Sequence, residues 1–183
     1  MSPLRLVVGL GNPGAEYENT RHNVGFMVLD RMAQGVSDWK RERAWQAQIT
    51  RVEGVVLCKP ETFMNLSGRA VAAVARFYQI PTDGILVVLD EMALPLGRLR
   101  LRAGGSAAGH NGMKSIMEAL GTQDVARLRL GIGGAAPGEA VGHVLGKFRK
   151  DERLAVEEML ARSEDAVRMV QREGLQPAMN AFN

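Results

Sequence analysis

Two histidines and one aspartate stand where they could activate a water molecule. His22 lies at a loop-to-helix junction, and His110 lies in a Gly-rich loop just before a predicted helix. Asp90 ends the apolar run 85–89, and open α/β sheets form their crevices at the carboxyl ends of strands. A carboxylate there can accept the N–H of an imidazole, fix its tautomer and stabilise its cation, which makes a general base. Helix or turn capping is the alternative for each of the three.

Three asparagines complete the polar inventory. Asn12, Asn65 and Asn111 fall in Gly-flanked loops or at helix starts. A neutral amide at such a place could hold an ester carbonyl or its oxyanion without a metal. Capping or turn formation is the alternative for all three, and it is a strong one for Asn65, which closely precedes a predicted helix.

Other chemistries lack their motifs. The sequence contains no G-x-S-x-G elbow, no G-x-x-x-x-G-K-[ST] phosphate loop and no H-E-x-x-H zinc site. Cys58 follows an apolar strand with no adjacent histidine, so we expect it to be buried and inert. His143 has apolar neighbours and is interpreted as structural. We therefore expect water activated by His and Asp, with no cofactor and no metal.

The Gly-rich opening offers a competing interpretation. Residues 9–14, GLGNPG, match G-x-G-x-x-G directly after a first strand, as in dinucleotide-binding folds. That mechanism needs a helix opening at the glycines and an acid closing the second strand. Here Pro13-Gly14 favours a turn, and the nearest acid, Asp30, lies inside a helical pattern. A nicotinamide-dependent oxidoreductase is thus the disfavoured alternative.

Strand and helix patterns alternate along the chain. Dense apolar runs predict buried strands at 4–10, 55–58 and 85–89, and alternating Arg and Leu predict half-exposed strands at 98–102 and 127–132. Helical spacing covers 24–33, 68–78, 112–120 and 154–172, with a stop at Gly121 and another at Gly174 and Pro177. This order predicts an α/β three-layer fold, with residues 1–183 as a single domain.

Composition excludes several classes of protein. Of 183 residues, 46% are hydrophobic and 23% charged, which is typical of globular chains rather than disordered ones. No uncharged apolar run approaches the roughly 18 residues of a membrane span. The apolar stretch 4–10 lacks a cationic region and a cleavage site, so it predicts a strand and not a signal peptide. One cysteine fits a reducing compartment, and we expect a cytoplasmic protein.

Positive charge is concentrated in the middle of the chain. Residues 96–150 carry 9 Lys/Arg against 3 Asp/Glu, a net charge of +6. Arginine supplies 18 of the 23 cations of the chain, and its planar fork of donors matches phosphate well. A basic, Gly-rich segment favours a polyanionic partner, with a solvated basic face as the alternative.

Taken together, the motifs resemble the bacterial peptidyl-tRNA hydrolase family. The resemblance covers nearly the whole chain, and the matching stretches occur in order: 8–17, 20–25, 59–68, 90–91 with 94–97, 104–114, 127–133 and 144–148. The chain departs from the family at Met92-Ala93, where many relatives carry a further acid, and at Gly134-Ala135, where relatives often carry a basic or polar residue.

The resemblance implies a fold, a reaction and residue roles. It implies a monomeric α/β sandwich with a twisted mixed β-sheet, and hydrolysis of the ester joining a peptide to the 3′ ribose of tRNA. Its base would be His22, oriented by Asp90, with Asn12 polarising the ester. The implied substrate-binding residues are Tyr17, Met64, Asn65, His110 and Asn111. Arg102 and Arg129 would clamp phosphates of the acceptor stem and 3′ end.

The resemblance also sets the partners to be expected. Peptidyl-tRNA is the partner it implies, with no membrane and no DNA. A non-catalytic RNA-binding protein on the same fold is the alternative, and the presence of His22, Asp90, Asn12 and Asn111 argues against it.

Overall fold

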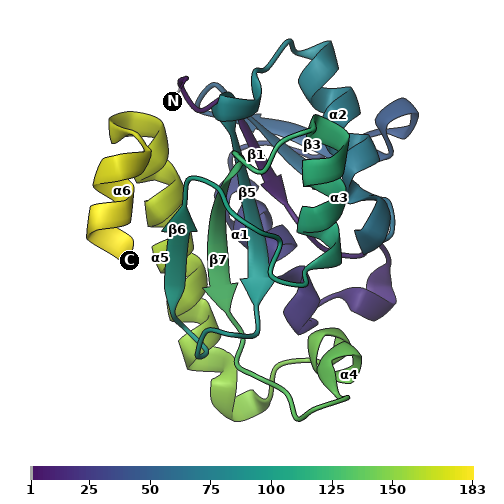
Figure 1. The fold of residues 1–183 in the computed structure, drawn as a ribbon, viewed down its shortest axis with the longest axis vertical. Helices are drawn as coiled ribbons and strands as arrows, with labels where there is room; N and C mark the ends of the chain where they lie inside the picture. Colours follow the sequence, from purple (N-terminus) through teal and green to yellow (C-terminus); the bar gives the residue numbers. More distant parts are fainter. Residues whose placement is uncertain (1) are drawn as a thin grey trace.

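The computed structural model describes residues 2–183 and contains one seven-stranded mixed sheet (Figure 1). The strand order is β2-β3-β4-β1-β5-β7-β6. The central strands β4, β1, β5 and β7 run parallel, whereas β2, β3 and β6 pair antiparallel at the two edges. The strands are β1 (Leu6–Gly9), β2 (Lys40–Glu42), β3 (Ala47–Val52), β4 (Val55–Pro60), β5 (Ile85–Glu91), β6 (Leu99–Arg102) and β7 (Ala126–Gly131).

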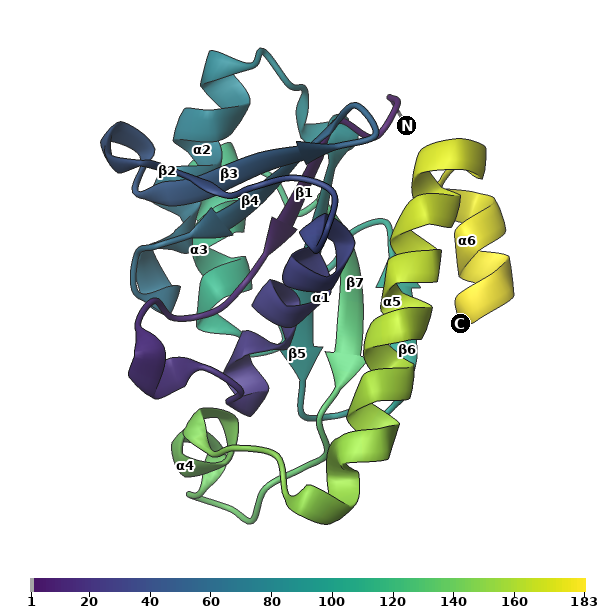
Figure 2. The ribbon, with the colours of Figure 1, turned by 180° about the vertical axis from the view of Figure 1, so that it is seen from behind.

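Helices cover both faces of this sheet. Helices α2 and α3 lie on one face, and α1 and α5 lie on the other, as the two opposite views show (Figures 1 and 2). The α-helices are α1 (Val24–Ala33), α2 (Ser67–Phe77), α3 (Asn111–Leu120), α4 (Ala140–Leu145), α5 (Arg153–Glu173) and α6 (Leu175–Phe182). Short 3-10 turns include η1 (Ala15–Tyr17), η2 (Arg21–Asn23) and η4 (Met64–Leu66). The predicted α/β three-layer sandwich with a mixed sheet is confirmed.

Alternation along the strands divides the interior into two cores. In β1, Val7 packs with α1 and α5, whereas Leu6 and Val8 pack with α2 and α3. All three side chains are fully buried, because β1 is a central strand with helices over both faces. Dense apolar runs are the expected signature of such strands. The carboxyl ends of β5 and β7 point toward α4, which lies beyond the end of the sheet (Figure 2).

Two glycines bring the end of β1 against the start of α1. A Cβ atom added to Gly9 would lie 2.4 Å from the carbonyl oxygen of Gly25, and one added to Gly25 would lie 2.4 Å from the carbonyl oxygen of Val88. Both obstacles are backbone, so neither can move aside like a flexible side chain. The contact places the residues just before α1 close to the carboxyl end of β5.

The Gly-rich loop does not lead into an α-helix. Residues 9–14 are followed by η1 and η2, and α1 begins only at Val24. The helix N-terminus that a dinucleotide-binding loop requires at its glycines is therefore not present at this place.

The C-terminal stop was predicted wrongly in one respect. Gly174 ends α5 with a φ of 98°, but a further helix, α6, begins at Leu175 and contains Pro177. Proline is tolerated in the first turn of a helix because the N–H groups there have no intrahelical partner. Pro177 lies in that first turn, so it starts a helix instead of ending one.

Strand β7 also departs from its simple alternating pattern. Alternation predicts the arginines of this strand on a half-exposed face, but Arg127 is 0% exposed. Its guanidinium donates to the carbonyl oxygens of Gly105, Ser106 and Gln123 at 2.8–2.9 Å. Arg127 thus binds the loop that precedes α3 to the sheet.

No helix within residues 2–183 combines the length and the apolar character that crossing a bilayer requires.

Candidate active site

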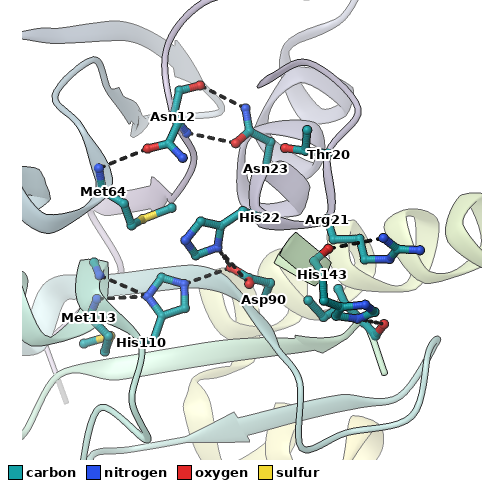
Figure 3. Close-up of polar contacts among 12 residues, drawn as sticks. Asn12, Thr20, Arg21, His22, Asn23, Met64, Asp90, His110, Met113 and His143 are labelled. Carbon is teal, nitrogen blue, oxygen red and sulfur yellow. Dashed lines mark hydrogen bonds and ion pairs between the residues drawn. The ribbon is translucent and has the colours of Figure 1, made fainter. Parts of the chain in front are cut away.

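A buried carboxylate joins two imidazoles at the carboxyl end of β5. Asp90 is 3% exposed, and both of its oxygens lie 2.9 Å from Nδ1 of His22. Its Oδ1 also lies 2.8 Å from Nε2 of His110. The two rings are 5.0 Å apart between centroids (Figure 3). The arrangement brings together three residues separated by 68 and 20 positions in the chain.

The hydrogen bonds fix which nitrogen of His110 carries the proton. Its Nδ1 accepts from the backbone N–H groups of Gly112 and Met113, at 3.1 and 3.3 Å, and so caps α3. A nitrogen that accepts two hydrogen bonds has no proton of its own in the neutral ring. Its Nε2 is therefore the donor to Asp90.

The contact with Asp90 uses one nitrogen of His22 and leaves the other free to accept a proton. An ionised carboxylate only accepts hydrogen bonds, so Nδ1 of His22 donates to Asp90 and Nε2 holds the lone pair. The His22 side chain is 14% exposed, which leaves part of the ring open to solvent. This is the arrangement of a histidine that takes a proton from water while a carboxylate stabilises the resulting cation.

The environment keeps Asp90 ionised. Burial alone would raise its pKa, but the interactions of the carboxylate with His110, followed by those with His22, outweigh burial and lower the pKa to about 2. Such a carboxylate carries a full negative charge at neutral pH, as an orienting partner of an imidazole must.

Asn12 is held by its neighbours in one orientation. Its backbone N–H donates to Oδ1 of Asn23 at 2.8 Å, and its carbonyl accepts from Nδ2 of Asn23 at 3.0 Å (Figure 3). Its side-chain Oδ1 accepts from the backbone N–H of Met64 at 3.0 Å. The amide nitrogen Nδ2 is thus the part of the side chain left to donate to another group. Asn23 and its clasp were not singled out from the sequence.

A cavity of about 180 Å³ opens onto the imidazoles. Its lining combines polar or charged side chains with small and apolar residues, three of them from α4: His22, Asp90, Glu91, Met92, Ala108, Gly109, His110, Asn111, Ala140, Val141 and Val144. Four other cavities, of about 280 to 460 Å³, are larger, but no imidazole lines them. The chemistry therefore favours the smaller one.

Arg21 ties the segment that carries His22 to α4. Its Nη1 donates to the carbonyl oxygen of His143 at 3.2 Å, and its Nη2 lies 3.4 Å from Oε1 of Glu152. Its backbone N–H donates to the carbonyl oxygen of Gly146 at 3.0 Å. His143 itself lies within hydrogen-bond distance of the carbonyls of Ile132 and Gly133, which agrees with a structural role. No pattern in the sequence indicated this contact across 122 residues.

The remaining predicted substrate-binding residues are spread over the site and its surroundings. Asn111 lines the cavity, whereas Met64 is buried and contributes its N–H to Asn12. Tyr17, in η1, is partly buried, and Asn65, in η4, is exposed. Neither Tyr17 nor Asn65 is among the residues that line the cavity.

The two predicted phosphate-binding arginines differ in exposure and in the polar contacts they already make. Arg102 is exposed at the end of β6, opposite Arg127 in the antiparallel pairing. Arg129 is partly engaged, because it lies 3.4 Å from Oε1 of Glu91 and donates to the carbonyl oxygen of Ser106 at 2.9 Å. Both project from the same face of the sheet, as the β6–β7 register requires.

His22, Asp90 and His110 are also the donor types that bind transition metals, and their ligand atoms lie within 4.8 Å of one another. The 2.8 and 2.9 Å separations between imidazole nitrogens and carboxylate oxygens are those of hydrogen bonds. The geometry of the three therefore fits a hydrogen-bonded unit.

The fold and the site define a class, which is an α/β protein whose cleft holds an imidazole fixed by a buried aspartate, as in hydrolases that activate water. The model of the family described as peptidyl-tRNA hydrolase matches residues 6–183. The chain belongs to the peptidyl-tRNA hydrolase family.

Individual relatives agree with the family match. The peptidyl-tRNA hydrolase of Thermus thermophilus is 53% identical over 179 residues, covering 97% of this chain and 95% of the relative. That of Akkermansia muciniphila is 47% identical over 184 residues, covering 100% and 97%. The crystal structure of the Acinetobacter baumannii peptidyl-tRNA hydrolase superimposes with a TM-score of 0.93 at 35% identity, covering 100% of this chain and 96% of that one.

The lowered pKa of Asp90 predicts how its replacement alters stability with pH. Because the pKa falls from the ordinary 3.8 to about 2 on folding, the ionised carboxylate stabilises the fold by about 2 kcal/mol at neutral pH. This contribution is complete above the unfolded pKa and is lost as the pH falls toward 2. Urea unfolding at pH 6 should find Asp90→Asn less stable than the parent, with a gap that narrows by pH 3.

Asp165→Asn is the matched control, since Asp165 is an exposed carboxylate on α5. It should leave the unfolding free energy nearly unchanged at both pH values. A gap for Asp90→Asn that stays constant from pH 6 to pH 3 would contradict the electrostatic account of Asp90.

Proposed function

We propose that this chain hydrolyses peptidyl-tRNA at the site formed by His22 and Asp90. Membership of the family gives the reaction, which is cleavage of the ester between the peptide and the 3′ ribose of tRNA to release free tRNA for translation. The observation that supports this site is the pair of 2.9 Å contacts between Nδ1 of His22 and the buried carboxylate of Asp90. They leave Nε2 of His22 as a base next to the cavity.

The proposed reaction uses water as the nucleophile. Nε2 of His22 takes a proton from the water as its oxygen attacks the ester carbonyl. Asp90 stabilises the imidazolium that forms, and the imidazolium then gives its proton to the departing 3′ oxygen of the ribose. The amide Nδ2 of Asn12, together with Asn111, stabilises the negative charge that develops on the carbonyl oxygen.

We assign the peptide side of the substrate to the surroundings of Asn12. Met64 and Asn65 lie on η4, whose first N–H fixes the Asn12 amide, and Tyr17 lies on the loop between β1 and η2. An extended ligand leaving the cavity past Asn12 would meet these elements. Asn65 is exposed, so its amide is free to bind the peptide backbone.

We assign the nucleic-acid side to the basic segment. Residues 96–150 carry the excess of positive charge. Arg129 lies on β7, which runs toward the cavity, and Arg102 lies on the same face of the sheet at the far end of the antiparallel β6, opposite the start of β7. Electrostatic contacts to phosphates of the acceptor stem and 3′ end would orient the ester toward His22. We further propose that the chain acts as a monomer in the cytoplasm.

The role of His22 predicts a large loss of rate without loss of binding. A positioned general base contributes ~10²–10⁴-fold, so His22→Ala should lower kcat by that factor while tRNA affinity changes little. The measurement is release of free tRNA from an N-blocked aminoacyl-tRNA, run beside the unblocked ester. His143→Gln, which keeps a side-chain N–H for the same carbonyls, is the matched control and should retain turnover within a few-fold. Unchanged turnover in His22→Ala would remove this residue as the base.

The role of Arg102 and Arg129 predicts a change in salt dependence. Each lost phosphate contact should lower the slope of log Kd against log salt by about one. Arg102→Ala and Arg129→Ala should therefore weaken tRNA binding and flatten this slope, as followed by fluorescence titration at several salt concentrations. Arg172→Ala, an exposed arginine near the end of α5, is the control and should keep the parent slope. Parent slopes in both site variants would rule out the clamp.

A further inference from the structure

We infer that His110 is a positioning residue that acts on the base through Asp90. Its imidazole, held by the start of α3, takes part of the hydrogen-bonding capacity of Asp90 and so weakens the hydrogen bond that His22 donates to the same carboxylate. This inference deepens the proposed function and rests on His22 being the base. It assigns to His110 a role that needs no contact with the substrate.

The first observation is that His110 is fixed at both nitrogens. Its Nδ1 caps α3 by accepting from Gly112 and Met113, and its Nε2 donates to Oδ1 of Asp90 at 2.8 Å. Its side chain is only 8% exposed. An imidazole is the one ring that can accept from a helix end and donate to a carboxylate at the same time.

The second observation follows from the cap. A proton on Nδ1 of His110 would face two N–H donors and would break both hydrogen bonds. It would also stand at the positive end of the α3 dipole. A proton on this nitrogen would therefore cost the cap of α3. Of the two imidazoles on Asp90, only His22 has a second nitrogen free to take a proton.

The third observation is that both rings share one acceptor. Oδ1 of Asp90 accepts from His22 at 2.9 Å and from His110 at 2.8 Å. A carboxylate that already accepts a short hydrogen bond has less negative charge to offer a second donor. His110 therefore weakens the pull of Asp90 on the His22 proton, which lets the ring return the proton to the leaving group.

Few other charges face His22. Glu91 follows Asp90 on β5, and its Oε1 lies 3.4 Å from Nη1 of Arg129 on β7. The guanidinium of Arg21, on η2 itself, is directed to His143 and Glu152. The residues of α4 that line the cavity, Ala140, Val141 and Val144, are apolar. Asp90, Glu91 and His110 are thus the titratable groups that share the cavity with His22.

Two substitutions separate the cap from the donor. In His110→Asn, the side-chain oxygen can still cap α3, but the shorter amide cannot reach Asp90. In His110→Gln, the longer amide can donate to Asp90 but cannot cap the helix at the same time. The readouts are the pH profile of kcat/KM and the urea unfolding free energy.

We expect the two variants to have opposite effects. His110→Asn should keep the cap of α3 and move the acid limb of kcat/KM upward by ~0.5–1 pH unit, because Asp90 then accepts the hydrogen bond of His22 without a competing donor. At pH values below that limb, the shift of ~0.5–1 unit corresponds to a rate of His110→Asn that is 3–10-fold lower than the parent rate. His110→Gln should keep the parent limb and lose stability. The same limb position in the parent and in His110→Asn would overturn the inference, as would a ~10²-fold loss in both variants with no shift.

A measurement without turnover distinguishes this inference from the proposed function. Long-range ¹H–¹⁵N spectra of the free protein should show His110 as the neutral Nε2–H tautomer throughout the pH range in which the rate falls. A second proton on His110 in that range would overturn the inference, whatever the role of His22. Turnover that survives in His22→Ala would instead overturn the proposed function and leave the His110 tautomer unchanged.

Discussion

The structure depends on one buried carboxylate that is ionised and satisfied at the end of a central strand. Desolvation opposes a negative charge at Asp90, and without partners the group would become neutral. His22 and His110 supply these partners, and their donors lower its pKa to about 2. Because the buried charge needs both hydrogen bonds, the two rings must keep the positions in which they donate.

The rest of the fold serves to bring these three side chains together. Asp90 is placed by β5, and His110 is placed by the N-terminus of α3, which it caps. His22 precedes α1, which can approach the sheet only because Gly9 and Gly25 lack side chains. Arg21 then holds the same segment against α4 through the carbonyl of His143. Backbone groups thus do most of the positioning, and few other charges are needed near the base.

Local pattern predicted much of this architecture. Helix 24–33 was predicted with its observed bounds, and the apolar run at 85–89 predicted the strand that ends near Asp90, because hydrophobic periodicity reflects burial directly. Pro177 was misinterpreted because a proline that stops a helix when it lies in the interior is tolerated in the first turn, which is its place in α6. The burial of Arg127 could not be foreseen, since alternation assigns a face but does not say what covers it. That residues 1–183 form one domain stays a prediction.

The site was predictable in its members but not in its connections. Residue types and their places before helices or after a strand identified His22, Asp90, His110 and Asn12. The clasp between Asn12 and Asn23 and the tie from Arg21 to α4 depend on tertiary contacts that no local pattern carries. The double hydrogen bonding of His110 is of the same kind, because it needs the helix end and the carboxylate in one place.

In this site both imidazoles donate to Asp90, and Nε2 of His22 carries no proton. Neutron diffraction from deuterated crystals near pH 7.5 observes these positions directly. The account predicts nuclear density for deuterium on Nδ1 of His22 and Nε2 of His110, with none on Nδ1 of His110 or on the carboxylate. Deuterium on Nε2 of His22 with Nδ1 bare, or on an oxygen of Asp90, would contradict it.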